Sequence, residues 1–462
     1  MLTAYPLPVF PRRVLALAAV PSAAALGLAA LTAPSAGSAA ASGSDDDRGR
    51  VSRLAETNGL AVAEMRQLLR DPSVRVTDDG RAYVVDPAAE GRVGPTTAAR
   101  GVAPLSRTFR LHSNPRARRT IFLDFDGTEV KGTAWNRQVG VKNGRHPGWD
   151  PANNGRGFTD REKRVVQSVW ARVAEDYAPF AIDVTTEQPS DARITRSRRG
   201  DKAYGTRVLI SGSRDAHSRI CDRQCGGVAF INVFSAVGKA HRRHQPAWVF
   251  PAGLSQDTKA VAEAATHEAG HTFGLVHDGG LLSSYYEGHG SWAPIMGAAY
   301  FRPISQWSRG SYSGATTNQD DLAVIARRGA HYRRDEAGSK PRSAARRVPD
   351  GTAYITRRGD VDVFRLGRCS GRVKVRAVVA RISPNLDVRL RLLRKGKPVG
   401  TSNPPSGTIS RDRARGLNAT VTKRLRRGVY YAEVDGVGRG DPSTSYDDYG
   451  SLGAYKLRVR GC

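Results

Sequence analysis

Long apolar runs and lysine are both scarce in this chain of 462 residues. After the first forty residues, no stretch is long and apolar enough to cross a membrane, and the mean hydropathy is -0.45, which excludes a polytopic membrane protein and predicts a soluble one. Arginine outnumbers lysine by 60 to 12, a skew that genome composition can produce. The net charge of +29 is therefore weak support for a nucleic-acid partner, and no recognised nucleic-acid-binding motif accompanies it.

Cysteine is also scarce, with four residues at Cys221, Cys225, Cys369 and Cys462. An even, sparse set in an exported chain predicts two disulfides, and the simplest pairing is Cys221–Cys225 and Cys369–Cys462. Zinc binding by all four is the alternative, but the spacing lacks a second close pair.

The first forty residues predict a secretory signal peptide rather than part of the fold. Arg12 and Arg13 precede a small, apolar region from 14 to about 31, and Ser38-Ala39-Ala40 offers a cleavage site. A retained anchor is the alternative, although Pro21 and many small residues make a weak span. We expect a secreted, extracellular protein without a stable membrane span, with the Sec and Tat export routes both open.

The rest of the chain divides by composition into four parts. Residues 41–118 are polar and predict a pro-segment or a disordered spacer, with one helix at 61–69 and a basic cluster at 116–119 as a processing site. Residues 119–333 predict an α/β (α+β) domain with a mixed sheet, and 334–350 a linker. Residues 351–462 alternate apolar and polar positions between turns, which predicts an antiparallel β-sandwich. The expected strands are 121–125, 182–186, 207–210, 227–234, 361–364, 373–376, 388–392 and 429–432, and the expected helices are 160–177, 257–273 and one from 318.

A histidine-rich stretch at 267–278 carries the chemistry. His267 and His271 are four residues apart, so on a helix their side chains point the same way and can hold one Zn²⁺. Gly274 can end the helix in a left-handed conformation, which lets the chain return His277 as a third ligand and leaves one position open for water. Glu268 can reach that water as general base and pass its proton to the leaving amine.

This pattern resembles the metzincin zinc metalloproteases, and Asp278 after the third histidine resembles their reprolysin (adamalysin-like) branch. The resemblance implies a zinc-dependent endopeptidase acting on proteins or peptides. It also implies that Met296, in the stretch Pro294-Ile295-Met296-Gly297, forms an apolar floor under the imidazoles. In some metzincins a tyrosine two residues after that methionine assists the metal. Here position 298 is Ala, and Tyr300 is the nearest tyrosine.

Two further stretches carry resemblances. Residues 226–231 resemble the edge strand that pairs with an extended substrate in metzincins, with an ordinary edge strand as the alternative. Residues 359–364 and 435–455 resemble bacterial pre-peptidase C-terminal domains. The acidic side chains Asp435, Asp441, Asp447 and Asp448 are candidate Ca²⁺ ligands, and exposed turn carboxylates are the alternative.

Other functions remain open at this point. Asp124 and Asp126 follow an apolar strand, as in haloacid-dehalogenase-like phosphohydrolases, where two such acids serve as nucleophile and acid/base. An inactive protease-like binding or adhesion protein is a second alternative. Residues 351–462 carry 24 cations and 9 anions, whereas residues 251–300 carry one cation and five anions. This distribution predicts that the C-terminal domain holds acidic cell-wall or matrix surfaces near a locally acidic protease site.

Overall fold

The computed structural model describes residues 42–89, 101–152, 155, 157–222, 224–342 and 345–462. The predicted signal peptide at 1–40 lies outside these residues. The chain forms two compact units, Met1–Asp47 and Arg48–Cys462, and all the contacts below lie within the second. None of the helices in the described ranges is long and apolar enough to span a bilayer.

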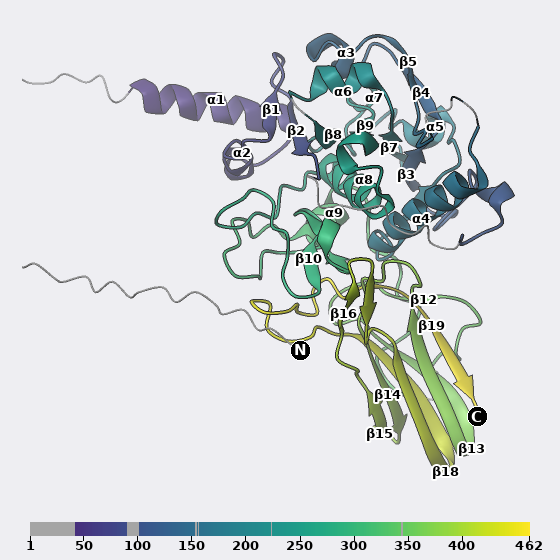
Figure 1. Cartoon of the computed structure of the whole chain (residues 1–462). Coiled ribbons are helices and arrows are strands. Elements are labelled where there is room, and N and C mark those ends of the chain that lie inside the picture. Colours follow the sequence, from purple (N-terminus) through teal and green to yellow (C-terminus); the bar gives the residue numbers. More distant parts are fainter. Residues whose placement is uncertain (1–41, 90–100, 153–154, 156, 223, 343–344) are drawn as a thin grey trace, which may run out of the picture. The chain divides into compact units, whose positions relative to one another are not determined.

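A seven-stranded mixed sheet forms the centre of the α/β domain (Figure 1). Its strand order is β1-β2-β8-β9-β7-β3-β6, in which β9, β7, β3 and β6 run parallel and β8 runs antiparallel to β9. The expected mixed sheet is thus confirmed. The strands are β1 Val74–Val76, β2 Ala82–Pro87, β3 Arg119–Asp124, β6 Ile182–Thr185, β7 Tyr204–Ile210, β8 Cys225–Phe230 and β9 Ala247–Val249.

Two long helices pack together in this domain, α4 (Asp160–Asp176) and α8 (Thr258–Phe273). Helix α4 begins with the predicted capping box, in which Glu162 accepts a hydrogen bond from the backbone N–H of Thr159 at 2.7 Å. The Tyr177 hydroxyl, directly after α4, donates to the Thr266 carbonyl of α8 at 3.0 Å. The four-residue spacing that predicted α4 therefore places its apolar face against the helix that carries the histidines.

Shorter elements connect these parts. They are α3 Ala134–Gln138, α5 Asp191–Ile194, α6 Arg214–Ile220, α7 Lys239–Arg243, α9 Asp321–Arg327, β4 Gly127–Val130, β5 Gly144–Pro147, β10 Trp292–Pro294 and β11 Ile304–Gln306, with 3₁₀ turns at Leu105–Arg107, Pro251–Leu254 and Ala299–Phe301.

Two predicted boundaries in this domain were wrong. Strand β8 ends at Phe230 rather than Phe234, because Asn232 adopts a left-handed conformation (φ 55°) and its N–H donates to the His271 carbonyl. Helix α9 begins at Asp321 rather than Asn318, because the Asp320 carboxylate caps the N–H of Ala323 at 2.8 Å.

The segment before β3 is folded wherever it is described. It forms α1 (Ser42–Asn58), the predicted helix as α2 (Val62–Leu68), and the strands β1 and β2. An apolar cluster of this segment packs against Ile231 and Val276 of the α/β domain. Its buried members are Val51, Ala55, Met65, Leu68, Ala82 and Val84. Residues 74–87 thereby extend the central sheet beyond β8.

The C-terminal domain is an antiparallel six-stranded sheet in the order β12-β19-β13-β18-β14-β15, as the alternating pattern predicted. The strands are β12 Ala353–Ile355, β13 Val361–Val379, β14 Val388–Arg394, β15 Lys397–Ser402, β18 Ala419–Gly436 and β19 Gly453–Arg460, and a separate hairpin pairs β16 Gly407–Ser410 with β17 Arg413–Arg415.

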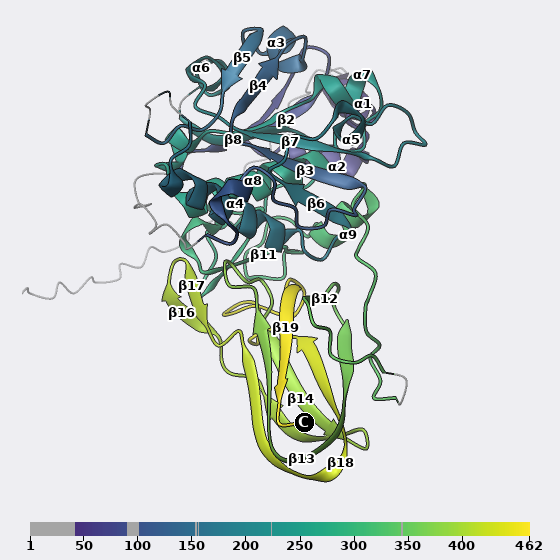
Figure 2. The same ribbon diagram turned by 90° about the vertical axis from the view of Figure 1, so that its right-hand side faces the viewer.

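Two long strands, β13 and β18, organise this domain. The predicted strands 361–364 and 373–376 are parts of the one strand β13, because bulges near Gly367 and Gly371 bend it without ending it. Figure 2 shows β13 and β18 curving along their length. Gly400 of β15 lies so close to Val421 of β18 that an added Cβ would come within 2.8 Å of it, so the curved sheet packs on itself in two layers.

Candidate metal centre

Helix α8 carries the first two histidines. Its N-terminus is capped by Asp257, which accepts from the N–H of Ala260 at 2.9 Å, and five alanines favour the helical conformation along its length. Every residue of α8 is buried. The rings of His267 and His271 lie on the same face with centroids 4.7 Å apart, as the four-residue spacing requires.

A glycine turn brings in the third histidine. Gly274 ends α8 with φ 96°, the left-handed conformation expected of it, and its N–H donates to the His271 carbonyl at 2.8 Å. The chain then turns back, so that the ring centroid of His277 lies 5.2 Å from that of His267 and 4.9 Å from that of His271. The three predicted ligands therefore converge.

Hydrogen bonds at Nδ1 orient all three rings. His267 Nδ1 pairs with the Ile295 carbonyl at 2.9 Å and His271 Nδ1 with the Leu275 carbonyl at 2.8 Å, so in both rings Nδ1 carries the proton and Nε2 presents its lone pair. Burial lowers the pKa of His267 to about 3, which keeps the ring neutral. The Nε2 atoms of His267 and His271 are buried without a hydrogen-bond partner among the described residues.

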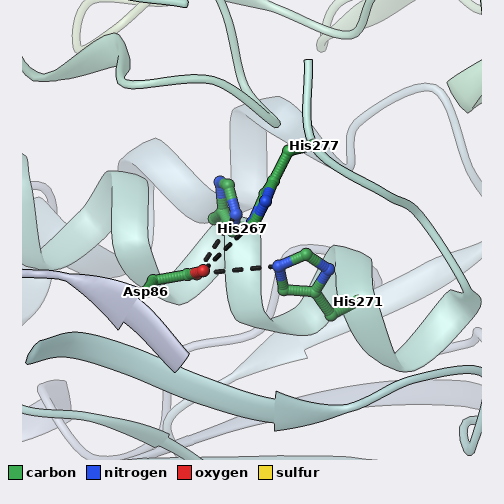
Figure 3. A group of neighbouring side chains, drawn as sticks. All are labelled: Asp86, His267, His271 and His277. Atoms are coloured by element: carbon green, nitrogen blue, oxygen red, sulfur yellow. Dashed lines mark hydrogen bonds and ion pairs between the residues drawn. The ribbon is translucent and has the colours of Figure 1, made fainter. Parts of the chain in front are cut away.

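An aspartate that the sequence did not single out faces these lone pairs. Asp86 extends from β2 toward the three rings (Figure 3), and its side chain is almost completely buried. Its Oδ2 lies 3.2 Å from His267 Nε2 and 3.6 Å from His271 Nε2, and its Oδ1 lies 3.0 Å from His277 Nε2. Burial alone would raise the pKa of Asp86, but the neighbouring histidines lower it well below its usual range, so the carboxylate is charged.

These distances fit a tetrahedral metal site. Four ligands held about 2.0 to 2.1 Å from one zinc ion lie about 3.3 Å from one another. Asp86 Oδ2 lies 3.2 Å from His267 Nε2 and 3.6 Å from His271 Nε2, close to that edge length, while the 3.0 Å distance to His277 Nε2 is made by the other carboxylate oxygen, Oδ1. Two nitrogen lone pairs and a carboxylate directed at one buried point repel one another unless a cation lies between them. The donor set therefore fits Zn²⁺, with three imidazoles and one carboxylate oxygen.

Glu268 follows His267 on α8, and its carboxylate is not one of the groups that converge with the three rings. Its carboxylate is completely buried, and neither oxygen has a hydrogen-bond partner within the described part of the chain. Burial, and secondly the charge of Asp86, raise the pKa of Glu268 well above its usual range. The backbone of Gly227 in β8 passes directly over it, since a Cβ added there would lie 2.0 Å from Glu268 Oε1.

The turn at 294–297 lies under the helix, where the resemblance placed it. Met296 is completely buried, and a Cβ added to Gly270 would lie 2.8 Å from its Sδ. The turn also orients the site through its backbone, because the Ile295 carbonyl pairs with His267 and the Met296 carbonyl accepts from the N–H of Asp278 at 2.8 Å. Asp278 itself is buried behind the third histidine, and burial raises its pKa to about 7.

Two tyrosines lie near the rings. Tyr300 lines a cavity of about 270 Å³ next to His267, together with Ala298 and Phe301. Tyr285, which the sequence analysis missed, packs its ring on His277 at a centroid distance of 4.1 Å and donates its hydroxyl to Asp86 Oδ1 at 2.8 Å. Tyr285 follows the third histidine by eight residues in a loop, so no spacing rule marks it.

Both predicted disulfides are present, Cys221–Cys225 and Cys369–Cys462. The first precedes and begins β8, so it anchors the strand that crosses Glu268. The second joins the last residue to β13.

The remaining candidate residues have other contacts. Asp124 is buried, forms an ion pair with Arg207 and accepts from the N–H of Gly127 at 2.9 Å, while Asp126 is exposed. Of the candidate Ca²⁺ ligands, three are paired with arginines and Asp441 accepts from the N–H of Ser443 at 2.8 Å. The three pairs are Asp435–Arg389, Asp447–Arg309 and Asp448–Arg358.

Comparison with known proteins adds little to this geometry. No protein-family model matches the chain, and no curated protein matches it. Among solved structures, the chain is similar to the pre-peptidase C-terminal domain of a collagenase from Bacillus anthracis, with 14% sequence identity and a TM-score of 0.17. That similarity covers 27% of this chain and 100% of the other. The function proposed below therefore rests on the geometry of the site.

Proposed function

We propose that the chain is a secreted zinc-dependent endopeptidase with Glu268 as its general base. The observation that carries the proposal is the convergence of three buried histidines next to an unpaired buried glutamate. The Nδ1 hydrogen bonds of His267 and His271 fix both rings with Nε2 directed at one point. A purely structural zinc site has no use for an acidic side chain that does not bind the metal, whereas peptide hydrolysis requires one as general base.

His267, His271 and His277 would hold the metal. A zinc ion held there would supply Lewis acidity, which polarises a peptide carbonyl and lowers the pKa of a water molecule. Glu268 would take a proton from water as the water oxygen bonds to the carbonyl carbon, and would deliver that proton to the amine nitrogen as the C–N bond breaks. Glu268 is buried and neither of its oxygens has a hydrogen-bond partner in the described part of the chain, so no neighbouring group competes for the carboxylate during the two transfers.

Strand β8 would align the substrate. It runs antiparallel to β9 on one side and pairs with β2 on the other, and an extended peptide that takes the place of β2 would form main-chain hydrogen bonds that do not depend on sequence. The absence of a side chain at Gly227 lets the peptide backbone pass within reach of Glu268. The cavity of about 270 Å³ beside His267 is also lined by residues 86–89, and its remaining wall of Ala298, Tyr300 and Phe301 would receive a substrate side chain once those residues leave.

The test compares the purified, processed protein with its Glu268→Gln variant on a reduced, unfolded protein substrate. Glu129→Gln is the matched control, because Glu129 is exposed on β4. We expect the parent and the control to cut the substrate, a chelator to stop cutting, and added zinc to restore it. Glu268→Gln should bind zinc as tightly as the parent and cut at least about 100-fold more slowly. Equal cutting by Glu268→Gln and the parent would refute the proposal.

A further inference from the structure

The segment before the α/β domain occupies the edge at which a substrate would pair. Strand β2 runs antiparallel to β8, with Val84 opposite Ala229, Val85 opposite Val228 and Asp86 opposite Gly227. The Gly227 position is the one that crosses Glu268. While β2 is in place, no other strand can form main-chain hydrogen bonds with this edge of β8.

In this register, the side chain of Asp86 rather than a peptide bond of β2 lies at the metal centre. Asp86 Oδ1 and Oδ2 together lie within 3.6 Å of all three Nε2 atoms, and Tyr285 donates to Oδ1 at 2.8 Å. A water molecule or a substrate carbonyl would need this same position. A carboxylate is a good zinc ligand but offers no bond for the enzyme to hydrolyse.

The segment is held by more than this one contact. Asp71, just before β1, accepts from His277 Nδ1 at 2.6 Å. The Asn232 side chain donates to the Asn58 carbonyl at 2.8 Å, and Arg328 pairs with Glu64 at 3.2 Å. Together with the apolar cluster against Ile231 and Val276, these non-covalent contacts hold the segment against the α/β domain.

We propose that Asp86 is the fourth ligand of the zinc ion, and that residues 48–89 keep the protease latent until the chain is cut after β2 and the segment leaves. This inference rests on the proposed function. It assigns to the segment both actions that latency requires: Asp86 excludes water from the metal, and β2 excludes substrate from β8.

Metal binding tests the ligand without reference to activity. The chain lacking residues 1–40 is prepared with Glu268→Gln so that it cannot cut itself, and is loaded with Co²⁺ as a spectroscopic substitute for zinc. Asp86→Asn and Asp86→Ala are compared with Asp78→Ala, since Asp78 is exposed in the same segment. We expect both Asp86 variants to shift the visible Co²⁺ absorption and to respond to added azide, and Asp78→Ala to match the parent in both respects. Zinc affinity should fall by at least about tenfold in the Asp86 variants. Identical spectra in all variants would overturn the assignment.

Activity tests latency, with Glu268 restored. A site for a specific protease is placed between residues 89 and 101, and the cut chain is separated from residues 41–89 before assay. The intact parent should be silent and the separated chain active. Intact Asp86→Asn should show at least about tenfold more activity than the intact parent, whereas intact Asp78→Ala should show no increase over the intact parent.

The outcomes separate the two hypotheses. If the separated chain binds zinc but does not cut, the endopeptidase proposal fails. If the separated parent is active but the intact parent is equally active, only the latency proposal fails. If the separated chain no longer binds zinc, the metal needs Asp86 as a permanent ligand. That result would also overturn the latency proposal.

Discussion

Replacing Gly270 tests whether Met296 is seated against the histidine helix. An alanine Cβ at position 270 would lie 2.8 Å from Met296 Sδ and 3.2 Å from Leu275 Cδ1, both closer than ordinary contact. Overpacking of this kind costs about 1–3 kcal/mol, while glycine to alanine inside a helix gains about 1 kcal/mol. We expect Gly270→Ala to destabilise the domain by about 1 kcal/mol.

The sign should reverse when the methionine is removed. Met296→Ala alone leaves a cavity that costs about 2–5 kcal/mol. In that background the closest clash at position 270 is gone, so Gly270→Ala should stabilise by up to about 1 kcal/mol. The resulting coupling of about 2 kcal/mol is typical of residues in direct contact.

Thermal unfolding followed by tryptophan fluorescence measures this cycle. All six tryptophans lie between residues 135 and 307, so the signal reports mainly on the α/β domain. The Glu268→Gln background prevents self-cleavage. A change of 1 kcal/mol moves the melting temperature by about 2–4 °C in a domain of this size. If Gly270→Ala raises the melting temperature equally in both backgrounds, Met296 does not lie under the helix and the argument is refuted.

Two further predictions follow from buried side chains. Tyr285→Phe in the processed enzyme should lower kcat about 100-fold with little change in KM, because the Tyr285 hydroxyl now donates to Asp86 Oδ1, where a substrate oxyanion would develop. Tyr300→Phe is the control, and equal losses in both would contradict the assignment. Burial raises the pKa of Glu175 from 4.5 to about 8, and the charge of Asp176 acts in the same direction. The folded state therefore favours the neutral form of Glu175. Its contribution to stability is complete below pH 4.5 and is lost as pH rises through about 8, a loss of at most about 5 kcal/mol. Glu175→Gln should therefore melt higher than the parent at pH 9 and similarly at pH 4, and a difference of equal size at both would count against this titration.

The local parts of the site could be predicted because their geometry depends on short spacings. Four residues place His271 over His267, and a glycine three residues later ends the helix whatever the rest of the chain does. The position of Met296 was harder to predict, since it depends on a turn that returns to Gly270. The resemblance supplied it where spacing alone could not.

Asp86 could not be predicted, because its role depends on a strand pairing between residues about 140 positions apart. The aromatic and β-branched residues Tyr83, Val84 and Val85 favour a strand, but nothing local tells which edge it joins or in which register. A shift of one residue would turn Asp86 to the other face of the sheet. The polar composition of residues 41–118 left a pro-segment and a disordered spacer equally open, although 48–89 contains enough apolar side chains to cover Ile231 and Val276.

The third histidine differs from the other two in what holds its ring. His267 and His271 pair through Nδ1 with carbonyls of the α/β domain itself, whereas His277 Nδ1 pairs with Asp71 of the N-terminal segment. The segment therefore contacts the metal centre both directly, through Asp86, and through the orientation of one imidazole. Because orienting partners of this kind strengthen metal binding, we expect the chain that retains residues 48–89 to bind a metal ion more tightly than the α/β domain does by itself.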